Sequence, residues 1–130
     1  MQKQILAFIL ITASLLGILF LVFSLSNSNS GEVKSAITFK KDAIIYYYGN
    51  TCPHCAVLND WLKENKIAQK VKFEKKEVYS NQQNSLELEA AAKECGLDTS
   101  AIGVPFVYAK GKCYVGSDKA KEFFQKQIAL

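Results

Sequence analysis

Two cysteines three positions apart, Cys52 and Cys55, form the pattern with the most specific chemistry in this sequence. They stand in the run Cys52-Pro53-His54-Cys55. Two thiols at this spacing at the start of a helix can close a small disulfide, and the unpaired N–H groups there stabilise a thiolate. Pro53 preorganises the turn, and His54 can present positive charge or a hydrogen bond to the sulfur. The run therefore predicts thiol–disulfide exchange, and a stabilised thiolate makes the disulfide form the better oxidant.

Metal binding is the alternative chemistry for the same cysteines. The chain has one histidine, His54, and it lies inside the motif. A closed four-ligand zinc site would therefore have to recruit Cys95 and Cys113 as well. We expect no metal or other cofactor, and a metal-binding module remains the alternative. The simpler interpretation of His54 itself is an ordinary surface residue.

A strand and a helix must position the motif, and the sequence predicts both. The β-branched and aromatic run 42–48 predicts a buried central strand, and the apolar spacing over 52–65 predicts the helix. We expect Val57 and Trp61 on the apolar side of that helix. The further predicted strands are 71–78, 102–108 and 112–115, and the further predicted helices are 85–95, which Gly96 ends, and one capped by Ser117.

This order, β-α-β-α-β-β-α, predicts the α/β fold class. A strand, a crossover helix and a parallel strand followed by an antiparallel hairpin give one mixed four-stranded sheet with helices on both faces. The arrangement places the Cys52 loop at the carboxyl end of the first strand and at the amino end of the first helix. The strand tyrosines and Trp61 are expected in the core.

A β-strand, the Cys52–Cys55 motif, a helix and then Gly103-Val104-Pro105 together resemble the thioredoxin superfamily. The likeness covers residues 42–130. It implies that Pro105 follows a cis peptide bond and faces the active disulfide, and that Val104 and Pro105 bind an extended substrate. It also implies that Cys52 is the exposed nucleophile and Cys55 the buried thiol that resolves the mixed disulfide.

The dipeptide Pro53-His54 is similar to that of the DsbA-like oxidants, whereas the compact size is closer to a glutaredoxin. Many members of the superfamily bury an acid six residues before the first cysteine, and Tyr46 holds that place here. The group that would exchange a proton with the resolving thiol therefore stays unnamed. The turn 116–118 resembles the glutathione-holding turn of glutaredoxins, without its paired glycines, and an N-cap role already accounts for Ser117.

Cys95 and Cys113 are a second pair of cysteines, eighteen positions apart. In an oxidising compartment two spare cysteines more often pair than persist as thiols. A structural disulfide is the favoured interpretation. Separate buried thiols and a redox relay with Cys52 and Cys55 are the alternatives.

Residues 5–23 contain no charged side chain, and a helix of that length would span about 28 Å, near the thickness of a bilayer's hydrocarbon core. We therefore expect a transmembrane signal anchor over 1–26, a Ser- and Asn-rich flexible tether over 27–41 and a thioredoxin-like domain over 42–130. A cleaved signal peptide is the alternative. The prediction is a single-pass membrane protein with its catalytic domain on the extracytoplasmic side.

The net charge of +4 comes from sixteen lysines, no arginine and twelve acids. These charges form no basic stripe with interleaved aromatics, so nucleic-acid binding is not expected. The predicted function is disulfide exchange with extracytoplasmic proteins through Cys52 and Cys55, as an oxidant, with a membrane redox partner. The alternatives are a glutathione-linked glutaredoxin, a membrane-tethered thiol reductase, the metal-binding module and a nonenzymatic structural domain.

Overall fold

The computed structural model describes residue 16 and residues 37–129. The chain divides into two units, Met1–Ser35 and Ala36–Leu130. The expected membrane segment 5–23 and the anchor range 1–26 lie outside the described residues, except for Leu16. Within the part that is described, no helix has both the length and the apolar character that crossing a bilayer requires.

The order of elements in residues 37–129 matches the predicted β-α-β-α-β-β-α order, with two short helical turns added. These turns are α3 and the 3-10 turn η1, which lie at places where the sequence shows no periodic apolar pattern. In chain order the elements are β1 (Ile44–Tyr48), α2 (Pro53–Glu64), α3 (Ile67–Lys70), β2 (Glu74–Glu77), α4 (Gln82–Glu94), η1 (Thr99–Ala101), β3 (Phe106–Ala109), β4 (Lys112–Val115) and α5 (Ser117–Ile128).

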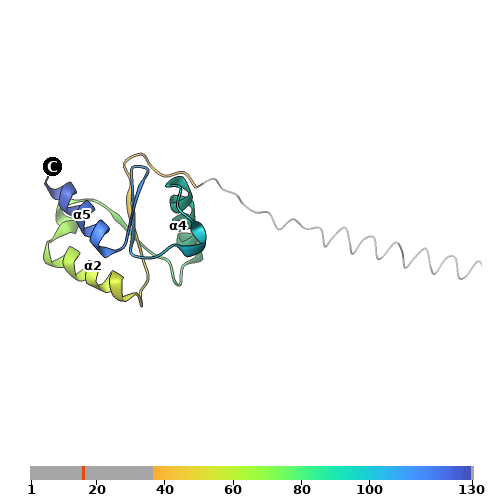
Figure 1. Cartoon of the computed structure of the whole chain (residues 1–130), viewed down its shortest axis with the longest axis horizontal. Coiled ribbons are helices and arrows are strands. Elements are labelled where there is room, and N and C mark those ends of the chain that lie inside the picture. The colour runs from red at the N-terminus through yellow and green to blue at the C-terminus, as the bar shows by residue number, and fades with distance from the viewer. Residues whose placement is uncertain (1–15, 17–36, 130) are drawn as a thin grey trace, which may run out of the picture. The chain divides into compact units, whose positions relative to one another are not determined.

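The strands form one mixed sheet in the order β2-β1-β3-β4. β1 runs parallel to β2 and antiparallel to β3, and β3 pairs antiparallel with β4. Helices α2 and α5 lie on one face of the sheet and α4 lies on the other (Figure 1). The predicted mixed four-stranded sheet with helices on both faces is confirmed.

Neighbouring residues of β1 serve opposite faces of the sheet, because side chains alternate along a strand. Tyr46 packs under α2 and α5, and Tyr47 packs under α4; both side chains are fully buried. The first cluster contains Tyr46, Leu58, Leu62, Ile67, Val71, Val107, Ala109, Ala120, Phe123 and Phe124. The second contains Ile45, Tyr47, Val78, Leu88, Ala91, Ala92, Phe106 and Tyr108. Because β1 is buried on both faces, its carboxyl end is held in place, and so is the start of the turn that leads to Cys52.

Three expectations about the helices were wrong, each for a local reason. Helix α4 begins earlier than residue 85, because the Asn81 side chain caps it by accepting a hydrogen bond from the Asn84 N–H at 3.1 Å. Ser117 is not an N-cap but the first residue of α5, and Gly116 takes the cap position without a side-chain bond. Val57 is 52% exposed, so the apolar side of α2 is narrower than expected.

The predicted tether extends too far toward the folded domain. Phe39 lies within the range 27–41, yet its ring packs against Tyr108 with ring centroids 4.4 Å apart. Phe39 also contacts the cluster under α4. Since one aromatic residue provides apolar surface that a Ser- and Asn-rich tether lacks, the packed region begins before residue 42.

Candidate active site

Cys52 lies where β1 has ended and α2 begins. After Tyr48 the chain turns at Gly49, whose carbonyl oxygen accepts a hydrogen bond from the Cys52 N–H at 3.2 Å. Cys52 is the N-cap of α2 in an extended conformation, and Pro53 follows at the start of the helix. Proline suits this position because the first helical N–H has no partner within the helix. The predicted placement of Cys52 at a helix N-terminus is confirmed.

The Cys52 sulfur is held between the first turn of α2 and a loop fifty residues away. Its Sγ accepts a hydrogen bond from the Cys55 N–H at 3.2 Å and donates one to the Val104 carbonyl oxygen at 3.4 Å. The Val104–Pro105 peptide bond is cis, as the resemblance predicts. The structure therefore brings together Cys52, Cys55, Val104 and Pro105, and both motif cysteines are free thiols.

The expectation that the Cys52 thiol is exposed was wrong. Cys52 is only 7% exposed and Cys55 is 1% exposed. The Val104 carbonyl and the Cys55 N–H occupy two sides of the Cys52 sulfur, so little of it faces solvent. A substrate reaching Cys52 therefore needs local movement at the rim of the site.

Pro53 and His54, by contrast, are exposed. Among the described residues the His54 ring makes no hydrogen bond to either sulfur, because His54 is exposed on the outer side of the first turn. Its role toward Cys52 stays a prediction. His54 can meet a substrate at the rim without touching the resting thiol.

Cys55 is the thiol best protected from ionisation. Burial, followed by its hydrogen bond with Cys52, raises the pKa of Cys55 to about 12. A thiol with this pKa stays protonated near neutral pH while its partner reacts. This property is the one expected of the thiol that resolves the mixed disulfide.

Tyr46 lies six residues before Cys52, and its hydroxyl donates a hydrogen bond to the Cys55 carbonyl oxygen at 3.4 Å. Burial, followed by the charges of Cys55 and Cys52, raises the pKa of Tyr46 well above its ordinary value. The phenol therefore stays protonated and supplies a donor beside Cys55, not a base.

Lys75 is the cation on the same side of the sheet. Its Nζ lies 5.6 Å from the centre of the Tyr46 ring and 4.9 Å from that of Tyr48, and it donates to Asn59 Oδ1 at 2.8 Å. Burial lowers the pKa of Lys75, and attraction to Cys55 acts in the opposite direction. Sequence reasoning missed Lys75, because lysines alternating along a strand usually face solvent. The only available signal was its position on the strand beside β1.

Glu77 joins the loop after β2 to the loop before Cys52. Its Oε1 accepts from the Tyr79 N–H at 2.8 Å and from the Asn50 N–H at 3.3 Å. Its Oε2 accepts from the Ser80 N–H at 2.9 Å and from the Ser80 hydroxyl at 2.5 Å. One carboxylate thus fixes Tyr79 beside the residues that lead into Cys52.

The hydrogen bonds to Glu77 predict a pH response of this junction. Bonds from Ser80 are the largest cause lowering the pKa of Glu77 from 4.5 to about 2. A lowered folded-state pKa means that the stabilisation is fully present above pH 4.5 and is lost as the pH falls through about 2. We expect an NMR titration of the Glu77 carboxyl carbon to show a midpoint near 2, and a midpoint at the ordinary value of 4.5 would contradict the bonding pattern.

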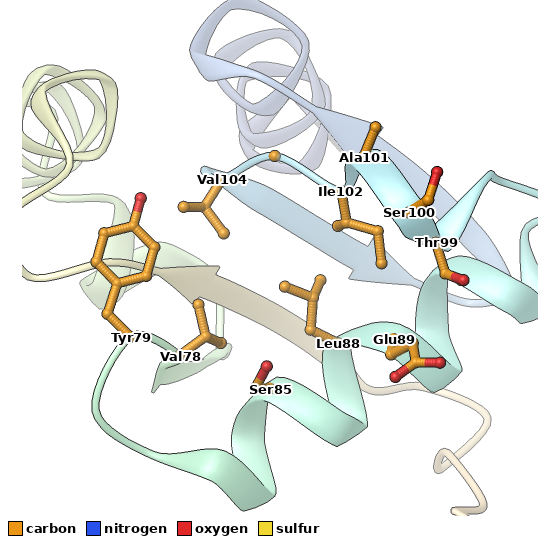
Figure 2. Close-up of a pocket in the computed structure, with 11 residues that line it drawn as sticks. Val78, Tyr79, Ser85, Leu88, Glu89, Thr99, Ser100, Ala101, Ile102 and Val104 are labelled. Carbon is orange, nitrogen blue, oxygen red and sulfur yellow. The ribbon is translucent and has the colours of Figure 1, made fainter.

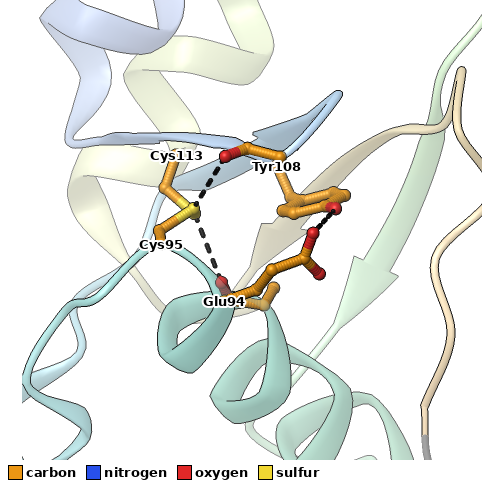
Figure 3. The surroundings of a disulfide bond; sticks show 6 residues. Glu94, Cys95, Tyr108 and Cys113 are labelled. Carbon is orange, nitrogen blue, oxygen red and sulfur yellow. Dashed lines mark hydrogen bonds between the residues drawn. A yellow bond between two sulfur atoms is a disulfide. The ribbon is translucent and has the colours of Figure 1, made fainter.

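Cys95 and Cys113 are joined by a disulfide with Cα atoms 6.1 Å apart (Figure 3). Cys95 is the C-cap of α4 and Cys113 lies on β4, so the bridge ties that helix to the edge of the sheet. Beside it the Tyr108 hydroxyl donates to Glu94 Oε1 at 2.7 Å (Figure 3). The favoured interpretation of Cys95 and Cys113, a structural disulfide, is confirmed.

The same bridge bears on metal binding. A four-ligand zinc site would need the Cys95 and Cys113 sulfurs as ligands, and these are bonded to each other. Across residues 37–129 no group of three or more His, Cys, Asp or Glu side chains is placed to hold a metal ion.

The turn at Gly116 lies against the loop that contains Val104 and Pro105. The Gly116 N–H donates to the Pro105 carbonyl oxygen at 2.8 Å, which places the start of α5 next to the cis-proline loop. The turn considered for glutathione contact thus adjoins the candidate site.

The chain matches no family model and no curated protein. Among solved structures it is similar to the oxidized glutaredoxin 2 from Chlamydomonas reinhardtii, with 22% identity and a TM-score of 0.45, over 67% of this chain and 75% of that one. It is also similar to wheat glutaredoxin, with 20% identity and a TM-score of 0.45, over 68% of this chain and 76% of that one. These similarities are too low to support an argument about activity, which therefore depends on the site itself.

Proposed function

We propose that this protein exchanges disulfides with thiol-bearing proteins through Cys52 and Cys55. The observation that carries the proposal is the position of the Cys52 sulfur, at the N-terminus of α2 and 3.4 Å from the Val104 carbonyl oxygen. Helix N-terminal N–H groups favour a negative charge on that sulfur. The loop at Val104 and Pro105 supplies backbone groups with which an extended substrate can pair.

In the oxidising direction the starting form has a Cys52–Cys55 disulfide. A substrate thiolate attacks Cys52 Sγ, the Cys52–Cys55 bond breaks, and Cys55 leaves with the electron pair and takes up a proton. The raised pKa of Cys55 drives that protonation. A second substrate thiolate then attacks the substrate sulfur of the mixed disulfide, releasing the substrate disulfide and Cys52. The substrate is oxidised by two electrons and the Cys52/Cys55 pair is reduced by two.

The direction of exchange and the cellular setting form the finer part of the proposal. Pro53-His54 favours the oxidant, the apolar segment 5–23 favours a signal anchor, and a domain outside the cytoplasm would pass its electrons to a membrane redox partner. A glutathione-linked activity is the second candidate. It is favoured by one observation, the hydrogen bond that places Gly116 against Pro105 at the site.

A redox titration of the full-length protein in detergent tests the proposal. The protein is equilibrated in glutathione buffers of graded potential, quenched with acid, alkylated and weighed. We expect one two-electron transition at Cys52 and Cys55, near about −120 mV for an oxidant, whereas a value near about −270 mV would make it a reductant. A stable glutathione adduct that turns over would favour the second candidate. If the pair does not cycle at any potential, the proposed function is wrong.

A further inference from the structure

Tyr79 is a residue near the candidate site that no pattern in the sequence selects. It follows β2 by two positions, and its backbone N–H is fixed by Glu77. Its ring lies directly on Gly49, so closely that a Cβ at residue 49 would overlap the ring. The side chain is nevertheless 57% exposed. The ring therefore covers the turn before Cys52 while one of its faces stays open to solvent.

A cavity of about 340 Å³ lies next to this ring. Tyr79 and Val104 both line it, and Figure 2 shows them together at one end, away from Thr99 and Ser100. The cavity is lined by Val78, Tyr79, Ser85, Leu88, Glu89, Thr99, Ser100, Ala101, Ile102, Gly103 and Val104. Tyr79 and Val104 thus mark the end of the cavity that is nearest to the cysteines.

The residues beside Tyr79 also contact Cys52. Gly49 accepts the hydrogen bond from the Cys52 N–H, and the Val104 carbonyl accepts the one from Cys52 Sγ. Partial burial, then the charges of Cys52 and Cys55, then a hydrogen bond with Cys52 raise the pKa of Tyr79. Tyr79 thus contacts one of the two residues whose carbonyl groups hold Cys52, and it lines a cavity together with the other.

We propose that Tyr79 is a catalytic residue that covers Cys52 and donates a hydrogen bond from its phenol to the Cys52 sulfur when that sulfur is negatively charged. The inference rests on the proposed function, since it assigns a role at the same reacting atom. A hydrogen bond to an anionic acceptor is stronger than one between neutral groups, so the donor favours the thiolate. The ring, packed on Gly49, limits access until it swings outward.

Alkylation of Cys52 separates the two parts of this role. The reduced full-length protein in detergent is treated with iodoacetamide between pH 5 and 9, and modification at Cys52 is followed by mass. For Tyr79→Phe, which keeps the ring, we expect a rate below wild type by about threefold to tenfold at pH 6 and the same limiting rate at high pH. For Tyr79→Ala, we expect a limiting rate above wild type by a similar factor.

Gly49→Ala tests the cover without changing Tyr79, because the added Cβ displaces the ring. We expect a limiting rate as high as that of Tyr79→Ala, and no further rise in the Gly49→Ala/Tyr79→Ala double variant. Tyr114→Phe is the matched control, since Tyr114 lies on β4, the edge strand on the opposite side of the sheet from β2, and packs on Phe123. It should alkylate as wild type does.

Each outcome counts for or against the inference. A Tyr79→Phe profile that matches wild type overturns the donor role, and an unchanged limiting rate in both Tyr79→Ala and Gly49→Ala overturns the cover. The alkylation experiment can fail or succeed independently of the proposed exchange activity. If the alkylation rates shift as expected and wild-type protein fails to cycle with glutathione, the cover stands and the exchange activity is wrong.

Discussion

Replacing Cys52 by serine is expected to lower the rate of disulfide exchange by on the order of 10³-fold or more. The thiolate is the nucleophile in this chemistry, and a serine hydroxyl is not ionised at neutral pH. No other free cysteine in residues 37–129 can substitute for it, because Cys55 is 1% exposed and its pKa is raised to about 12. The measurement is the oxidation of a dithiol peptide by the full-length protein, followed by mass.

Cys55→Ser is the matched control for that experiment. It keeps the attacking sulfur and removes the second one, so a mixed disulfide at Cys52 should accumulate instead of resolving. If the mixed disulfide accumulates in Cys55→Ser and Cys52→Ser shows no exchange, Cys52 is the thiol that forms the mixed disulfide and Cys55 is the thiol that resolves it. Exchange at the wild-type rate in Cys52→Ser would refute the assignment of the nucleophile.

Removing the Cys95–Cys113 bridge is expected to lower the free energy of unfolding by about 3 kcal/mol. The bridge closes a loop with a sequence separation of 18, and most of its effect comes from limiting the unfolded chain. Urea unfolding of Cys95→Ser/Cys113→Ser against wild type, both without reductant, gives the difference directly.

Cys52→Ser/Cys55→Ser is the control for the stability measurement, because these two cysteines are free thiols in the structure. It should change the free energy of unfolding much less. The variant without the bridge should still exchange disulfides at temperatures where it stays folded, since its bridge lies between α4 and β4 and not at Cys52. Loss of exchange by folded protein would instead favour the relay between the two cysteine pairs.

The part of the site that depends on local spacing was predictable from the sequence. Cys52 and Cys55 need only a strand before them and a helix after them, and the apolar run and the apolar spacing supply both. Pro105 came from the resemblance, because no local pattern links it to a cysteine fifty residues earlier. The two-sided burial of β1 followed from its unbroken run of apolar and aromatic residues.

The contacts that cross between loops were not predictable. Glu77 and Tyr79 meet the Cys52 turn only because β2 pairs in parallel with β1, which brings the ends of both strands to one edge. The burial of Val57 was misjudged for a related reason. Helical and strand periodicity identify the face that tends to be buried, whereas the width of the buried face depends on which neighbour packs there.

The sheet order leaves β2 and β4 as the outermost strands, and both carry charged side chains. β2 is made only of glutamate and lysine, from Glu74 to Glu77, and β4 opens with Lys112. Charged side chains on outer strands discourage another polypeptide from adding itself as a further strand. Under the proposed function, a substrate protein can therefore present its cysteine at the site and dissociate without adding a strand to the sheet.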